Sequence, residues 1–170
     1  MALLYLGLGS NLGERKQILH QTINLITKRI GSCLRLSAFY ETAPWGFVSE
    51  HPFLNAAALF QTRLAPEKIL IITQEIEREL GRTHKSTKLG YADRTIDIDL
   101  LLYDDNIIDK DITPDHGNTT NHLTLPHPLM HKRLFVLEPL AEIAPDTIHP
   151  TLHRTFRELL EICRKDSNTD

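Results

Sequence analysis

The chain is poor in cysteine and in net charge, and it lacks long apolar runs. Its 170 residues include two cysteines, Cys33 and Cys163, which lie far apart and in no metal-binding spacing, so we expect no disulfide framework. The formal charge of −3 leaves no basic excess for non-specific binding to nucleic acid. No stretch approaches the roughly 18 apolar residues of a membrane span, and no basic region precedes the apolar N-terminus. We therefore expect a cytoplasmic protein that binds neither nucleic acid nor a membrane.

Several common nucleotide and metal motifs are also absent. The sequence contains no Walker loop, no protein-kinase signature and no G-x-S-x-G elbow. The histidines at 116, 122, 127 and 131 show no zinc spacing, and no cysteine accompanies them. The run GLGSNLG fails as a dinucleotide fingerprint, because Leu12 stands where the third glycine is required. We interpret this run as a turn with Asn11 as helix N-cap and Glu14 as its reciprocal partner; alternatively, its glycines let the backbone approach a ligand.

Hydrophobic periodicity divides the chain into strands and helices. Apolar residues at helical spacing predict helices over 14–30, 66–80, 130–140 and 155–163, the first two ended by Gly31 and Gly81. Buried or alternating runs predict strands over 3–8, 33–40, 53–62 and 93–103, and polar composition predicts a loop over 109–121. This β-α-β-β-α-β order predicts an α+β, ferredoxin-like fold with an antiparallel sheet and additional C-terminal helices. The helices should cover one face of the sheet and leave the other for a site or for more chain. We expect a single domain over 1–164 and a polar tail over 165–170.

Two aspartates form the centre of the predicted site. In the segment DRTIDIDLLLY, Asp97 and Asp99 are two apart on a strand and should project side by side, roughly 6–7 Å apart. Two such carboxylates repel each other unless a cation lies between them, and Mg²⁺ is often held by one or two carboxylates plus substrate phosphates. Arg94, just before them, offers donors for a phosphate. The alternative is an acidic strand face that is only solvated.

Other polar and aromatic groups are candidates to converge on this pair. A basic group comprises Arg82, His84, Lys85, Lys88, Arg94 and Arg133. His127 stands between two prolines, and Asn55 with Phe53, Phe135 and Trp45 would suit a flat heterocycle with a donor–acceptor edge. The alternatives are a solvated basic loop, a structural histidine and aromatic core residues.

With these motifs the chain resembles the 6-hydroxymethyl-7,8-dihydropterin pyrophosphokinase family of folate biosynthesis. The resemblance extends from position 3 to about position 162 and rests chiefly on D-R-T-I-D-I-D and L-P-H-P-L-M-H-K-R-L-F, with support from S-A-F-Y-E-T-A-P-W-G and F-L-N-A-A. It implies a ferredoxin-like fold and two small-molecule substrates, ATP and the pterin; we separately expect a monomer. It also implies transfer of pyrophosphate from ATP to the pterin hydroxymethyl group, with release of AMP.

The resemblance assigns roles residue by residue. Asp97 and Asp99 would hold two Mg²⁺ ions and, with Arg82 and Arg94, form the catalytic group. Pterin binding would involve Thr42, Ala43, Pro44, Trp45, Phe53, Asn55 and Phe135. ATP binding would involve Gln74, Glu77, Arg82, His84, Lys85, Arg94, Ile98, His127 and Arg133. The loops 42–52 and 83–93 would flank the site and close over it.

The chain departs from the family pattern at three places. His84 and Tyr91 stand where the family often has arginine and tryptophan, the loop between Arg82 and Arg94 is lengthened, and Trp45 replaces a smaller apolar residue. Two other classes of function stay open at this stage. One is a non-catalytic ferredoxin-like binding module; the other is a nucleotidyltransferase that uses paired aspartates and releases pyrophosphate.

Overall fold

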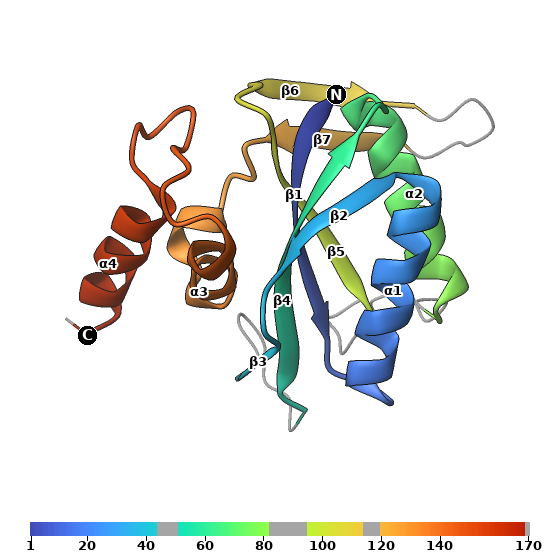
Figure 1. Cartoon of the computed structure of the whole chain (residues 1–170), viewed down its shortest axis with the longest axis horizontal. Coiled ribbons are helices and arrows are strands. Elements are labelled where there is room, and N and C mark those ends of the chain that lie inside the picture. The colour runs from blue at the N-terminus through green and yellow to red at the C-terminus, as the bar shows by residue number, and fades with distance from the viewer. Residues whose placement is uncertain (44–50, 82–94, 114–119, 169–170) are drawn as a thin grey trace.

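The computed structural model describes residues 1–43, 51–81, 95–113 and 120–168, and they form seven strands and four α-helices (Figure 1). The first half contains β1 (Ala2–Ser10), α1 (Arg15–Arg29), β2 (Gly31–Leu36), β3 (Tyr40–Thr42), β4 (Phe53–Thr62) and α2 (Pro66–Glu79). The second half contains β5 (Asp97–Tyr103), β6 (Ile108–Ile112), β7 (Asn121–Leu125), a 3₁₀ turn (Met130–Lys132), α3 (Leu134–Ile143) and α4 (Phe156–Ser167). None of the helices in this part of the chain has the length and apolar character needed to cross a membrane.

The main sheet has the strand order β2-β4-β1-β5, with every neighbouring pair antiparallel, and β3 adds to β4. Taken with α1 and α2, these four strands follow the chain as β-α-β-β-α-β, and their spatial order is that of the split βαβ arrangement. The predicted ferredoxin-like α+β fold is confirmed. Strands β6 and β7 form a separate two-stranded sheet.

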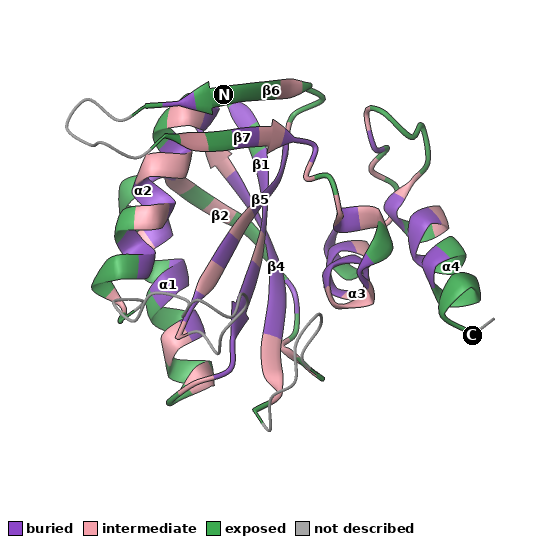
Figure 2. Cartoon of the chain, turned by 180° about the vertical axis from the view of Figure 1, so that it is seen from behind, coloured by how far each residue is buried: buried purple, intermediate pink, exposed green. Residues whose placement is uncertain are grey.

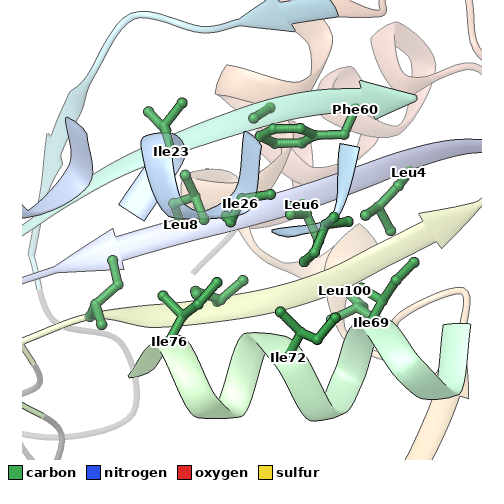
Figure 3. Packing of buried hydrophobic residues seen from close by; sticks show 14 of the residues in the cluster. Leu4, Leu6, Leu8, Ile23, Ile26, Phe60, Ile69, Ile72, Ile76 and Leu100 are labelled. Carbon is green, nitrogen blue, oxygen red and sulfur yellow. The ribbon is translucent and has the colours of Figure 1, made fainter. Parts of the chain in front are cut away.

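Helices cover both faces of the sheet, although not equally. On one face α1 and α2 bury the even-numbered leucines of β1 together with Ile26, Ile69 and Ile76 (Figure 3). On the opposite face α3 packs over part of the sheet and α4 lies on the outer side of α3; their second core includes Tyr5, Leu101, Leu137 and Phe156 (Figures 1 and 2). We expected the second face to hold either a site or further chain. It holds both, because the C-terminal helices leave one end of that face open.

The prediction of one half-buried strand over 33–40 is wrong. Strand β2 ends at Leu36 and β3 begins at Tyr40. Leu34 and Leu36 are 47% and 37% exposed, because β2 lies at the edge of the sheet. Ser37 lies between the two strands. Its hydroxyl accepts a hydrogen bond from the Ala57 N–H and donates one to the Ala38 carbonyl, in competition with regular strand pairing.

Two other local predictions are also wrong. Asn11 does not cap α1; its Nδ2 donates to the carbonyl of His51 at 3.2 Å, and Glu14 occupies the N-cap position without a side-chain cap bond. Residues 109–112, predicted as part of a polar loop, belong to strand β6, which pairs with β7. Its exposed acidic residues are held across the strands by His122, which contacts the carboxylates of Asp109 and Asp111. A sequence whose apolar residues stand only at the two ends gives no strand signal.

The C-terminal helices begin and end later than predicted. The predicted helix over 130–140 divides into the 3₁₀ turn and α3, which runs to Ile143, and α4 continues to Ser167. Thr155 begins α4 with a capping box, its hydroxyl accepting from the Glu158 N–H while the Glu158 carboxylate accepts from the Thr155 N–H.

Gly31 is required by a close approach of two strands, and it does not act as a left-handed helix cap. It is the first residue of β2, and a Cβ built there would lie 2.0 Å from the carbonyl oxygen of Gln61 on β4. We therefore expect Gly31→Ala to lower the free energy of unfolding by about 2 kcal/mol, because the strand backbones must separate to admit the methyl group. Urea unfolding would measure this. Gly7→Ala is the matched control, since its Cβ would meet the Leu101 side chain at an ordinary 3.6 Å; equal losses in both variants would contradict the prediction.

Candidate active site

A hollow lies on the partly open face of the sheet, where β1 ends and where β4 and β5 begin. It encloses about 670 Å³ of empty space, part of which is open to solvent. Its lining comes from three strands of the sheet, from β3 and from α3: Gly7, Leu8, Gly9, Thr42, Ala43, Phe53, Asn55, Ala56, Asp97, Asp99, Arg133, Phe135 and Val136.

Two glycines of β1 form the floor between the polar groups. In the sheet register Gly9 pairs with Asn55 on one side and with Asp97 on the other, and Gly7 pairs with Asp99. A Cβ at Gly9 would lie 2.9 Å from the Asn55 Oδ1 atom and 3.5 Å from the Phe53 ring. Gly7 lies in the strand predicted over 3–8, whereas the turn interpretation is wrong for Gly9, which also lies within β1. The alternative of close backbone approach to a ligand fits the position of both glycines.

The two aspartates lie together in the hollow, as the alternation of the strand predicted. Asp97 and Asp99 are half-buried and line it, whereas Ile98 and Leu100 between and beyond them are each 6% exposed and face α1 and α2. The described residues contain no group of three or more histidine, cysteine or acidic side chains that could hold a metal. In this part of the chain, Asp97 and Asp99 are a pair of carboxylates that could hold a cation together with oxygen ligands from a substrate.

The predicted aromatic and amide residues form one wall of the hollow. Phe53 comes from β4 and Phe135 from α3, and both line it. Asn55 is 5% exposed, and its Nδ2 donates to the Thr42 hydroxyl oxygen, which fixes the orientation of the amide. Ala43 completes the described part of this wall.

Arg133 brings a buried positive charge to the same hollow. Its side chain belongs to the N-cap residue of α3 and is only 8% exposed, with the guanidinium carbon 5.6 Å from the centre of the Phe135 ring. Because guanidinium groups form charge-assisted hydrogen bonds with phosphate oxygens, Arg133 is a candidate phosphate contact in a hollow that two carboxylates also line.

His127 is a neutral donor close to these charges. The Leu129 N–H donates to its Nδ1 at 3.1 Å, so the neutral ring carries its proton on Nε2. Burial, and then the positive charge of Arg133, lower the pKa of His127 to about 4, while the negative charge of Asp97 acts in the opposite direction. The Nε2–H therefore stays in place across physiological pH.

We expect His127 and His122 to titrate on opposite sides of pH 6.5. Hydrogen bonds to Asp111 and Asp109 raise the pKa of the exposed His122 ring, whereas that of His127 is about 4. Because unfolded His127 binds its proton at about 6.5, its burial stabilises the fold above pH 6.5, and this contribution is lost as the pH falls toward 4. An NMR pH titration of the histidine ring signals measures both values. A midpoint near 6.5 for His127 would contradict the assignment.

Four predicted ATP residues that the structure describes lie outside the lining of this hollow. One is His127, and the other three lie where α2 meets β5 and β7. Glu77 is 5% exposed and accepts a hydrogen bond from the Ile98 N–H at 3.2 Å. The Gln74 Oε1 accepts from the Nδ2 of Asn121 on β7 at 3.1 Å. The Ile98 side chain is part of the core, so only its backbone can contribute polar contacts.

Several predicted residues lie outside the described part of the chain: Pro44, Trp45, Arg82, His84, Lys85, Lys88, Tyr91, Arg94 and His116. Five lining residues were not among the predicted site residues: Leu8, Ala56 and Val136, together with Gly7 and Gly9, for which contact with a ligand was only the alternative interpretation. Val136 gave no signal, because an apolar residue on a buried helix face has the same pattern whether or not it borders a cavity.

Comparison with known proteins places the chain in a family. The family profile described as 7,8-dihydro-6-hydroxymethylpterin-pyrophosphokinase (HPPK) matches residues 5–145. The chain belongs to the HPPK family. A 2-amino-4-hydroxy-6-hydroxymethyldihydropteridine pyrophosphokinase of Porphyromonas gingivalis is 50% identical over 150 residues, covering 88% of this chain and 95% of that protein. The Bacillus subtilis protein of the same name is 36% identical over 168 residues, covering 98% and 93%.

Solved structures of HPPK domains share the fold. The crystal structure of wild-type Plasmodium falciparum HPPK-DHPS matches with a TM-score of 0.77 at 18% identity, covering 95% of this chain and 44% of that one. An HPPK-DHPS structure in complex with substrates matches with a TM-score of 0.79 at 16% identity, covering 99% and 44%. This chain thus spans less than half the length of those HPPK-DHPS chains, and the likeness concerns the fold alone.

Proposed function

We propose that this HPPK-family chain transfers pyrophosphate from ATP to 6-hydroxymethyl-7,8-dihydropterin in folate biosynthesis. The observation that carries the proposal is one hollow that combines an aromatic and amide wall with a carboxylate pair. A wall of this kind suits a flat heterocycle, and the carboxylates suit the cations that accompany ATP phosphates. The family membership and the names of the relatives support the same reaction.

The pterin ring would stack between Phe53 and Phe135. Both rings line the hollow from different elements, β4 and α3, so their positions depend on the tertiary structure. The Asn55 amide offers a donor and an acceptor to the edge of the ring, held in place by its bond to Thr42. The backbone from Thr42 to Ala43, with Pro44 and Trp45, would complete the contacts to that edge.

Two Mg²⁺ ions would be held by Asp97 and Asp99. The donor set fits such ions, since both groups are hard carboxylate oxygens on one strand face, and the remaining ligands would be phosphate oxygens and water. When bound, the ions would neutralise charge on the transferring phosphates. The chain's own contribution is to hold the carboxylates at a fixed spacing through the β1–β5 register.

The other residues predicted to bind ATP would position the triphosphate. Arg133 and neutral His127, with Arg82 and Arg94, would contact phosphate oxygens, and Gln74, Glu77 and Ile98, with His84 and Lys85, would contact ATP nearby. The hydroxymethyl oxygen would attack the β-phosphorus in line and lose its proton. The bond from that phosphorus to the oxygen bridging to the α-phosphate would break, and AMP would leave with that oxygen.

A product assay tests the proposal. Purified protein is incubated with ATP, Mg²⁺ and 6-hydroxymethyl-7,8-dihydropterin, and AMP, ADP and pyrophosphate are resolved. We expect AMP only when the pterin and Mg²⁺ are both present. Release of pyrophosphate would indicate a nucleotidyltransferase, and pterin binding indifferent to Mg²⁺ with no product would indicate a binding module.

We further propose that the chain acts as a cytoplasmic monomer. Both cysteines are free thiols, and Cys163 is buried, which fits a reducing compartment. Sedimentation of the purified chain, with and without ATP, tests the monomer; a stable dimer would overturn it.

A further inference from the structure

The short strand β3 carries one side of the proposed pterin wall and pairs with a single strand. Within the described part of the chain its three residues pair with β4 alone, in the register Tyr40–Asn55, Glu41–Leu54 and Thr42–Phe53. Side chains alternate along a strand, so Tyr40 and Thr42 face the side of the hollow and Glu41 faces α1. Three residues at a sheet edge hold their position weakly by backbone pairing alone.

From the α1 side, Arg15 joins β3 to the residue before β4. One of its guanidinium nitrogens donates to the Pro52 carbonyl at 2.9 Å, and the other contacts the Glu41 carboxylate at 3.1 Å. The Glu41 side chain is 60% exposed, so the ion pair contributes little stability by itself. Its effect is geometric, because one planar group holds two segments at a fixed separation.

From the α3 side, Glu142 holds the beginning of β3. Its carboxylate accepts from the Ala38 N–H, at 3.0 Å for the nearer oxygen, and from the Tyr40 hydroxyl. The bond to Glu142, followed by burial, raises the pKa of Tyr40 to about 12, so the hydroxyl stays a donor at physiological pH. Two contacts with charged groups thus reach β3 from helices on opposite faces of the sheet (Figure 1).

We propose that Arg15 and Glu142 are positioning residues for pterin binding, which hold β3 against the start of β4 and thereby fix Thr42, Asn55 and Phe53. Neither residue lines the hollow. The inference rests on the proposed function of the hollow, since it concerns how the pterin wall is held. According to this inference, contacts outside the hollow determine how well the pterin binds.

Steady-state kinetics of Arg15→Gln and Glu142→Gln tests this inference. We expect the KM for the pterin to rise roughly tenfold in each variant, as for other residues that support a binding group from behind, with the KM for ATP and kcat changed less than about twofold. Tyr40→Phe should reproduce part of the Glu142→Gln effect. Equilibrium binding of the fluorescent pterin supplies a second readout that does not depend on turnover.

Matched controls come from other contacts of the same two helices. Arg29→Gln removes the α1 contact with Glu79, and Arg164→Gln removes the contact that Glu138 of α3 makes with α4. These variants should keep the wild-type KM for both substrates. The inference is overturned if the pterin KM and binding are unchanged in Arg15→Gln and Glu142→Gln, or if the controls shift them equally. A wild-type chain that forms no AMP fails the proposed function instead, and the binding assay then shows separately whether the pterin wall exists.

Discussion

Replacing Asp97 or Asp99 by asparagine is expected to lower pyrophosphate transfer by about three orders of magnitude. The amide keeps the shape of the carboxylate but removes the charge that would hold a Mg²⁺ ion against the phosphates, and such electrostatic contributions carry most of phosphoryl-transfer catalysis. Both side chains line the hollow from the same strand face, so each loss should be nearly complete. The measurement is kcat for AMP formation over a Mg²⁺ titration.

The melting temperature of each variant shows whether it has lost a metal ligand or has lost its fold. Two neighbouring carboxylates on one strand face repel each other, so removing one charge in the absence of Mg²⁺ should leave the melting temperature equal or higher. Asp105→Asn is the control, because this exposed aspartate lies just beyond the end of β5. Near-normal turnover in either asparagine variant would contradict the assignment of that aspartate as a metal ligand.

Arg133→Met is expected to reduce kcat by about 100-fold. The side chain is 8% exposed and borders the hollow, so its charge acts in a poorly solvated setting where it would meet the charge that develops on the phosphates. Methionine preserves much of the buried volume against Phe135. Single-turnover measurement of AMP formation separates this loss from an effect on ATP binding.

Arg133→Met should also change the pKa of His127. The positive charge of Arg133 helps to depress the pKa of His127, so that pKa should rise in Arg133→Met, which a ring-signal titration detects. Lys132→Met removes the same charge from the exposed neighbouring position and should change neither quantity. Equal losses of activity in the two variants would show that Arg133 acts only through net charge.

The sequence was informative wherever structure follows from neighbouring residues. The alternation in DIDLLLY determined that Asp97 and Asp99 share a face, opposite to Ile98 and Leu100. The spacing of Phe53 and Asn55 on one strand was equally local, and the order of elements led to the ferredoxin-like fold. Side-chain period and chain order are properties of short stretches, so they can be read without knowledge of the rest of the molecule.

Tertiary contacts decided what the sequence did not. The register of β1 placed Gly9 between Asn55 and Asp97, so a glycine interpreted as part of a turn lies in the floor of the site. The edge position of β2 exposed Leu34 and Leu36, against an alternation that predicted burial. The packing of α3 on the sheet brought Arg133 beside the hollow that the aspartates line. Register, edge position and helix packing depend on pairs of residues far apart in the chain. The free energy that favours them comes from burying apolar surface in those contacts, so it cannot be inferred from a short stretch of sequence.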